Sequence, residues 1–133
     1  MTKIFLTAVG LAYLSLSAWC VMQPHSTARS VGFELTPGSG ESEYLVVYGG
    51  LQFALGVVFL RVLGRRSEPV KLLEMCVIVH ASLVAFRTWG FVVFEGFGNT
   101  TLVLAAVEWL ILIVATLLYL RDRRLPQTAE AAA

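Results

Sequence analysis

Four long apolar runs, separated by short polar segments, make up most of the chain. They cover about residues 4–22, 44–61, 71–94 and 101–120. A helix rises about 1.5 Å per residue, so crossing about 30 Å of hydrocarbon takes roughly 20 predominantly apolar residues. The pattern predicts an all-α fold, a four-helix transmembrane bundle with up-down-up-down topology. Residues 1–120 form one membrane domain in this interpretation, and residues 121–133 form a disordered cytoplasmic tail.

The segments between the runs predict where the helices begin and end. Residues 23–43 are rich in glycine, serine, proline and acidic residues, which predicts an outer loop with a short extended piece at Val31–Leu35. Ser67 is expected to cap the third span, and Asn99 or Thr100 the fourth. Asn99 also begins a glycosylation sequon, but its place in a tight turn favours the cap. The first run is expected to be a retained helix, because Trp19 and Cys20 do not suit a signal-peptide cleavage site.

Charge sets the predicted orientation. Charged residues form 14% of the chain, against about 25% in soluble domains. Lysine and arginine near span ends mark the cytoplasmic side, and here eight lie on one side and only Arg29 on the other. The eight are Lys3, Arg61, Arg65, Arg66, Lys71, Arg121, Arg123 and Arg124. Both termini are therefore predicted inside. The net charge of +1 and the lack of a basic patch among aromatics argue against nucleic acid as a partner.

Two charges lie deep within the apolar runs. A charge in hydrocarbon costs roughly 2.5–3.5 kcal/mol on insertion scales, so it is expected to be paired or functional. Arg87 precedes the end of the third run by seven residues, and Glu108 follows the start of the fourth by seven. Both therefore lie about 10 Å below the outer boundary. This equal depth predicts an Arg87–Glu108 ion pair in the outer half of the membrane.

Helical spacing predicts which residues face the inside of the bundle. The third span has an inward stripe of Cys76, His80, Leu83 and Arg87, and Glu108 lies on a similar stripe of the fourth. Tyr48, Gln52 and Tyr13 of the first two spans are expected to join the pair. Glu74 projects away from the stripe, where Lys71 is its expected partner. The polar cluster is then either a structural clamp, with Gln52 and Tyr48 taking its spare hydrogen bonds, or a pocket for a headgroup or a proton.

The string from Tyr48 to Gly56 has small residues at Gly49, Gly50, Ala54 and Gly56. Small residues let another helix approach closely. The helix could belong to this chain, which is the favoured interpretation, or to a second copy. Backbone approach to a ligand is a third option.

The remaining residues do not predict a metal site, a haem site, a disulfide or a known catalytic motif. His80 is expected to be a packing residue near the midplane, and His25 lies in the outer loop, so neither a metal site nor a bis-histidine haem is predicted. Cys20 and Cys76 are expected at opposite membrane faces, beyond the reach of a disulfide. No hydrolase triad, P-loop or Gly-x-Gly-x-x-Gly motif is present. We predict no enzyme activity and no cofactor.

Three short motifs carry a family resemblance: Tyr48-Gly49-Gly50-Leu51 after the acidic Glu41-Ser42-Glu43, Arg87-Thr88-Trp89-Gly90, and Glu108. Over about residues 4–120 the chain resembles the bacterial four-helix membrane proteins known as domain of unknown function 4345. Its architecture is similar to that of DoxX-like proteins, some of which associate with redox systems. The resemblance implies a bacterial inner membrane and no established activity.

The sequence thus predicts a small accessory or structural membrane protein. Its polar cluster would bind a lipid, quinone or other amphiphile, or the protein would serve as a subunit of a larger complex or a homo-oligomer. The alternative is a proton- or ion-coupled transporter that uses Glu108. The lack of an ionisable carboxylate in the first span separates the chain from four-helix multidrug exporters, which it resembles in size.

Overall fold

A computed structural model describes residues 1–64 and 68–124, and these residues form helices and connecting turns with no strand. Four helices are long and apolar enough to cross a membrane, which confirms the all-α class. The first, third and fourth are α1 (Thr2–Met22), α5 (Pro69–Val93) and α6 (Asn99–Asp122). The second is composite. It consists of α3 (Ser39–Tyr44), a π-helical segment η1 (Leu45–Leu51), α4 (Gln52–Leu60) and a 3₁₀ turn η2 (Arg61–Leu63).

The predicted outer loop contains two short helices, one on each side of the predicted extended piece at Val31–Leu35. In that piece Val31 and Gly32 form a turn, so the prediction is wrong for these two residues, and residues 33–35 have no regular secondary structure. Helix α2 (Pro24–Ser30) begins with proline, whose fixed φ suits the first helical turn. Helix α3 begins five residues before the predicted start of the second span. Gly38 adopts φ +79°, and its backbone N–H donates to Glu41 Oε2 at 3.0 Å. A carboxylate in the first turn that takes a backbone N–H stabilises the start of a helix.

The other helix ends differ in detail from the sequence prediction. Gly98, and neither Asn99 nor Thr100, occupies the N-cap position of α6, and no side chain caps it. Lys71 pairs with Glu68 at 2.5 Å and does not pair with Glu74. Helix α6 continues to Asp122, so the predicted tail starts too early. Ser67, the expected cap of α5, lies outside the described residues, as do Arg65, Arg66 and residues 125–133.

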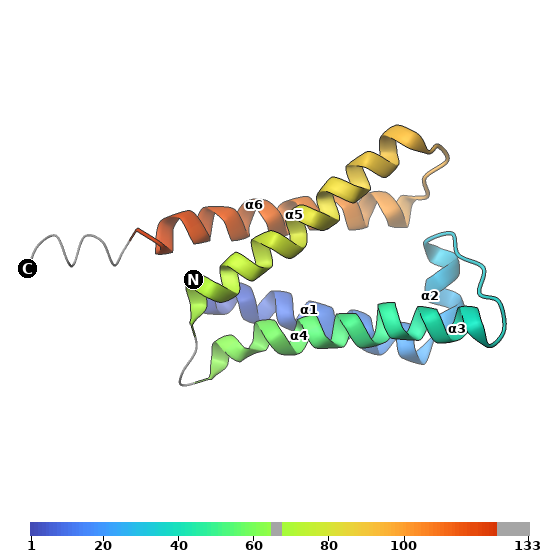
Figure 1. Cartoon of the computed structure of the whole chain (residues 1–133), viewed down its shortest axis with the longest axis horizontal. Coiled ribbons are helices and arrows are strands. Elements are labelled where there is room, and N and C mark those ends of the chain that lie inside the picture. Colours follow the sequence, from blue (N-terminus) through green and yellow to red (C-terminus); the bar gives the residue numbers. More distant parts are fainter. Residues whose placement is uncertain (65–67, 125–133) are drawn as a thin grey trace, which may run out of the picture.

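The long helices form two antiparallel hairpins, α1 with the composite second helix and α5 with α6 (Figure 1). The two helices of the first hairpin lie close together because glycines of one helix face glycines of the other. A Cβ added to Gly10 would lie 3.0 Å from the carbonyl oxygen of Gly56, and one added to Gly56 would lie 3.0 Å from that of Gly10. The hydroxyl of Ser17 donates to the Gly49 carbonyl oxygen at 2.8 Å. Small residues at these positions allow the backbones of α1 and α4 to approach.

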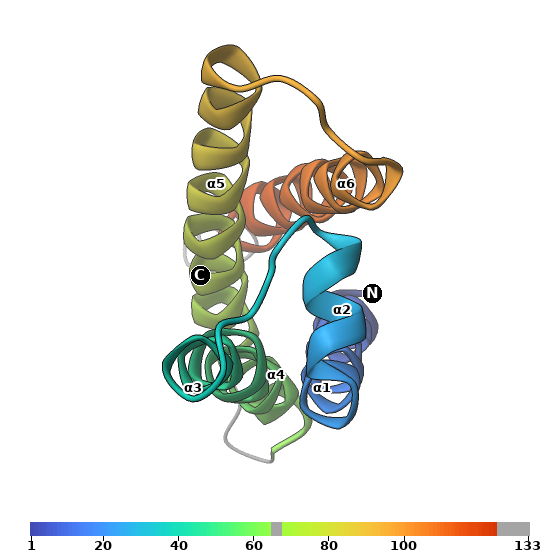
Figure 2. The same ribbon diagram turned by 90° about the vertical axis from the view of Figure 1, so that its right-hand side faces the viewer.

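The two hairpins join mainly at the end where the chain starts. A buried core there takes residues from all four long helices: Leu6, Val9, Phe59, Val62, Leu72, Leu73, Cys76, Ala115 and Leu118. At the other end the buried cluster of Cys20, Ala28 and Tyr44 belongs to the first hairpin and its α2–α3 connection alone. Figures 1 and 2 show α5 diverging from α4 toward that end. We call the two ends the terminal end and the α2–α3 end.

The surface of the four long helices is strongly apolar. Between 17% and 28% of the most hydrophobic window of each is buried within the protein. Large side chains such as Phe86, Val92 and Leu110 are more than 60% exposed. Monomeric soluble proteins rarely expose contiguous apolar surface on this scale. These helices are suited to a hydrocarbon environment, as expected of a multi-pass membrane protein.

Candidate functional site between the two hairpins

Arg87 and Glu108 meet across the α5–α6 hairpin. The Arg87 Nε lies 2.5 Å from Glu108 Oε2 and its Nη2 lies 2.6 Å from Oε1, a two-pronged contact between planar groups. The side chains are 27% and 13% exposed. Val84 is buried one turn before Arg87, whereas Leu83 of the predicted stripe is 38% exposed. Two parallel charge-assisted hydrogen bonds fix the geometry of the pair as well as adding energy.

Tyr13 and His80 link the two hairpins at mid-height. The Tyr13 hydroxyl lies 3.3 Å from His80 Nε2, and His80 Nδ1 lies 2.9 Å from the Cys76 carbonyl oxygen. A carbonyl oxygen can only accept, so Nδ1 carries the proton and the Tyr13 hydroxyl donates to Nε2. His80 is 1% exposed. The histidine is therefore a hydrogen-bonded packing residue, as the sequence predicted, and it also joins α1 to α5.

These two contacts lie on facing sides of the hairpins. Glu108 is close enough to exert an electrostatic effect on both Tyr13 and His80. Arg87 does the same on Tyr48 of the first hairpin. Tyr13, Tyr48, His80, Arg87 and Glu108 of the predicted polar cluster are thus neighbours, although they form two separate contacts.

Tyr48 has aromatic partners. Its ring stacks on that of Tyr44 at 4.5 Å and meets Phe33 edge-on at 5.9 Å. The Tyr44 hydroxyl in turn donates to Thr27 Oγ1 at 2.9 Å, which ties α3 to α2. Among the described residues no hydrogen bond joins Tyr48 or Gln52 to Arg87 or Glu108. The expectation that they take the spare hydrogen bonds of the pair is wrong, because Tyr48 packs toward the α2–α3 connection.

Gln52 is the first residue after the π-helical segment η1. Its Oε1 atom is buried and has no hydrogen-bond donor within the described part of the chain. A buried acceptor without a donor costs about 1–3 kcal/mol, so such groups need an explanation. π-helical segments occur frequently at functional sites. This combination makes Gln52 the most informative member of the predicted set.

The predicted small residues divide into two groups. Gly49 and Gly56 face α1, where an added Cβ would come within 2.8 Å of Val21 and 2.7 Å of Leu14, respectively. Gly50 and Ala54 are exposed on the opposite side. For these two the favoured interpretation, packing within the chain, is wrong, because α1 occupies only the Gly49–Gly56 face. A second copy as their partner stays a prediction. The sequence analysis did not identify Gly10 as a packing residue. Leucine lies four positions away on each side, so Gly10 is not part of a small-x-x-x-small motif.

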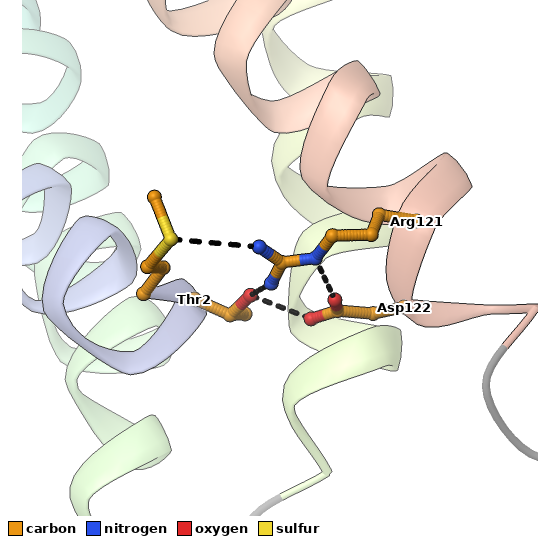
Figure 3. A network of polar contacts seen from close by, with 4 residues as sticks. Thr2, Arg121 and Asp122 are labelled. Carbon is orange, nitrogen blue, oxygen red and sulfur yellow. Dashed lines mark hydrogen bonds and ion pairs between the residues drawn. The ribbon is translucent and has the colours of Figure 1, made fainter.

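Two further features were not found from the sequence. One is a shallow apolar groove of about 410 Å³ along α5 and α6, lined by Ala81, Val84, Ala85, Thr88, Trp89, Val92, Trp109 and Leu112. The other is a polar clasp at the terminal end (Figure 3). There Thr2 Oγ1 donates to Asp122 Oδ2 at 2.5 Å, Arg121 Nε donates to Asp122 Oδ1 at 2.7 Å, and Arg121 Nη2 lies 3.1 Å from Thr2 Oγ1. The contact between Thr2 and Asp122 could not be predicted from the sequence, because residues so far apart along the chain are brought together only by the fold.

The two cysteines lie apart in the fold. Cys20 and Cys76 are both free and buried, in different clusters, as the sequence predicted. Over residues 1–64 and 68–124, no group of three or more histidine, cysteine, aspartate or glutamate side chains converges in a way that could hold a metal ion.

Comparison with known proteins found no match to a protein-family model, a curated protein or a solved structure. The resemblance to the four-helix family therefore stays a prediction that rests on the three short motifs.

Proposed function

We propose that the protein is a small accessory membrane protein that binds an amphiphile, such as a lipid or a quinone, between its two hairpins. The polar part of the ligand would lie beside Gln52, Tyr48, Arg87 and Glu108, and its apolar part between the diverging helices. The observation that carries this proposal is the buried Gln52 Oε1 without a donor. A hydroxyl or amide N–H of a bound lipid would satisfy it, as would a hydroxyl of the reduced quinol form of a quinone, because the quinone itself carries only acceptors.

The surroundings of Gln52 agree with a ligand that carries a polar headgroup. Hairpin α5–α6 contributes the Arg87–Glu108 ion pair, which has no net charge. The first hairpin contributes the π-helical segment η1, whose backbone departs from a regular α-helix. The core that joins the hairpins lies at the terminal end, so the side chains near the α2–α3 end are not sealed by a shared core. Sites of this kind combine mostly apolar walls with a few placed polar groups.

Substituting Gln52 by leucine should change protein stability and ligand binding in opposite directions. We expect Gln52→Leu to raise the free energy of unfolding of the ligand-free protein by about 1 kcal/mol, because an unsatisfied buried acceptor is removed. Retention of the co-purifying amphiphile should fall roughly tenfold, the equivalent of one lost hydrogen bond. Native mass spectrometry after gentle extraction, with denaturant titration of the delipidated protein, measures both.

The exposed Gln23→Leu is the matched control and should change neither quantity. A wild-type protein that carries no small molecule from its own membrane would contradict the proposal. So would a Gln52→Leu variant that retains the molecule as well as the wild type does.

The second candidate is a proton-coupled transporter, favoured by the 13% exposure of the Glu108 side chain and its contact with Arg87. In the ion pair the Glu108 carboxylate is held by Arg87, so taking up a proton would release Arg87 and losing the proton would restore the pair. This exchange of Arg87 for a proton is the step that would couple proton movement to transport. For this function, Glu108→Gln should abolish proton-linked flux in proteoliposomes, while Glu95→Gln in the exposed turn should leave it unchanged. Undiminished flux in Glu108→Gln, with helix content and melting temperature retained, excludes the transporter.

A further inference from the structure

The clasp at the terminal end gathers basic side chains from opposite ends of the sequence. Thr2 is hydrogen-bonded to both Arg121 and Asp122, which brings Lys3 at the start of α1 beside the last turn of α6. That turn is followed directly by Arg123 and Arg124. Asp122 accepts from Arg121 and neutralises it locally. Lys3, Arg123 and Arg124 form what we call the basic surface.

All three residues of the basic surface are exposed. None takes part in an ion pair among the described residues, whose four pairs are His25–Glu41, Lys71–Glu68, Arg87–Glu108 and Arg121–Asp122. The Arg123 guanidinium lies over the ring of half-buried Tyr119, 5.6 Å from its centroid. An aromatic ring and a cation at the end of a span are typical of the level of lipid headgroups.

The opposite end of the molecule has the reverse charge. Residues 23–43 and the α5–α6 turn at residues 94–98 contain four acidic residues, Glu34, Glu41, Glu43 and Glu95. In the same segments Arg29 is the one arginine, and there is no lysine. Anionic molecules are therefore attracted to the terminal end and repelled at the other. Basic side chains at the end of an α-helix also complement the partial negative charge of its last carbonyl groups.

We propose that the basic surface binds the headgroups of anionic phospholipids. The location favours lipid over any other anion, because Lys3 lies within the first turn of one spanning helix and Arg123 and Arg124 directly follow another. Phosphates of the surrounding leaflet are already at this level, and each basic residue near such a surface contributes a several-fold gain in affinity. The site lies at the opposite end from the proposed amphiphile site and does not depend on it.

The test uses the full chain in nanodiscs that contain either phosphatidylcholine alone or a mixture with phosphatidylglycerol, followed by native mass spectrometry of the released protein. At low salt we expect phosphatidylglycerol to be retained at least tenfold over its share of the bilayer, and the preference to fall as salt rises, since exposed charges are screened. The triple variant Lys3→Gln, Arg123→Gln, Arg124→Gln should lose the preference.

Two controls locate the effect. Arg29→Gln removes a basic charge from the opposite end and should leave the preference intact, whereas Arg123→Lys keeps the charge and should retain most of it. The three substituted side chains are exposed, so the melting temperature in phosphatidylcholine should stay close to that of the wild type. A triple variant that keeps the wild-type preference for phosphatidylglycerol, or an Arg29→Gln variant that loses it equally, overturns the proposal.

Discussion

Replacing Arg87 by alanine should lower the free energy of unfolding by about 3–5 kcal/mol, because the Glu108 carboxylate is left without its partner in apolar surroundings. The two hydrogen bonds of 2.5 and 2.6 Å between Arg87 and Glu108 are lost together. The carboxylate is only 13% exposed, so water cannot replace both. Denaturant unfolding in a fixed detergent or bilayer, followed by circular dichroism, measures the change.

The double variant Arg87→Met, Glu108→Leu distinguishes a clamp from a site. Replacing both partners by apolar side chains of similar volume often restores stability or increases it, since no buried charge remains. We expect the double variant to recover most of the loss. If it stays as unstable as Arg87→Ala, the contact between α5 and α6 depends on more than the pair. Recovered stability together with lost ligand retention would assign the pair to the proposed amphiphile site.

Gly56→Val should separate α1 from α4 and lower the free energy of unfolding by about 3 kcal/mol, near the upper range for overpacking. Even the first added carbon would lie 2.7 Å from Leu14 and 3.0 Å from the Gly10 carbonyl oxygen. The Leu14 side chain can move, but the Gly10 backbone cannot move without shifting α1. Denaturant unfolding measures the loss.

Gly50→Ala is the matched control on the same helix. A Cβ there would meet only the Leu45 carbonyl oxygen, at 4.0 Å. Alanine is also favoured over glycine in a helix by about 1 kcal/mol, so this variant should be as stable as the wild type or more stable. A loss at Gly50 comparable to that at Gly56 would contradict the helix contacts described above. It would instead indicate a contact between copies on the exposed Gly50–Ala54 face.

The sequence by itself determined the features that depend on length, period and depth. Apolar runs of about 20 residues can satisfy every backbone hydrogen bond only as helices, so the four long elements could be predicted. The Arg87–Glu108 contact also followed from sequence, because both residues lie seven positions from the ends of the runs that one short turn joins. Helical spacing likewise placed Gln52 and Gly56 on inward faces.

Short elements inside the predicted loop were beyond the reach of the sequence. Helix α2 has only seven residues, too few to be stable by propensity alone. Helix α3 is the N-terminal extension of the second spanning helix into the predicted loop. They depend on tertiary contacts, such as the hydrogen bond from Tyr44 to Thr27 and the burial of both residues. The composition of residues 23–43 therefore resembles that of an ordinary loop, although both ends of the segment are helical.

The tertiary structure alone decided which inward faces meet. Spacing shows that Gly10 and Gly56 can each receive a neighbour, but their mutual contact depends on the register between α1 and α4. In the same way, the Tyr13–His80 hydrogen bond and the Thr2–Asp122 clasp join residues that are 67 and 120 positions apart. Contacts at such separations are set by how the two hairpins pack at the terminal end and diverge beyond it. Local pattern carries no information about that packing, because it arises from side-chain shape on both partners at once.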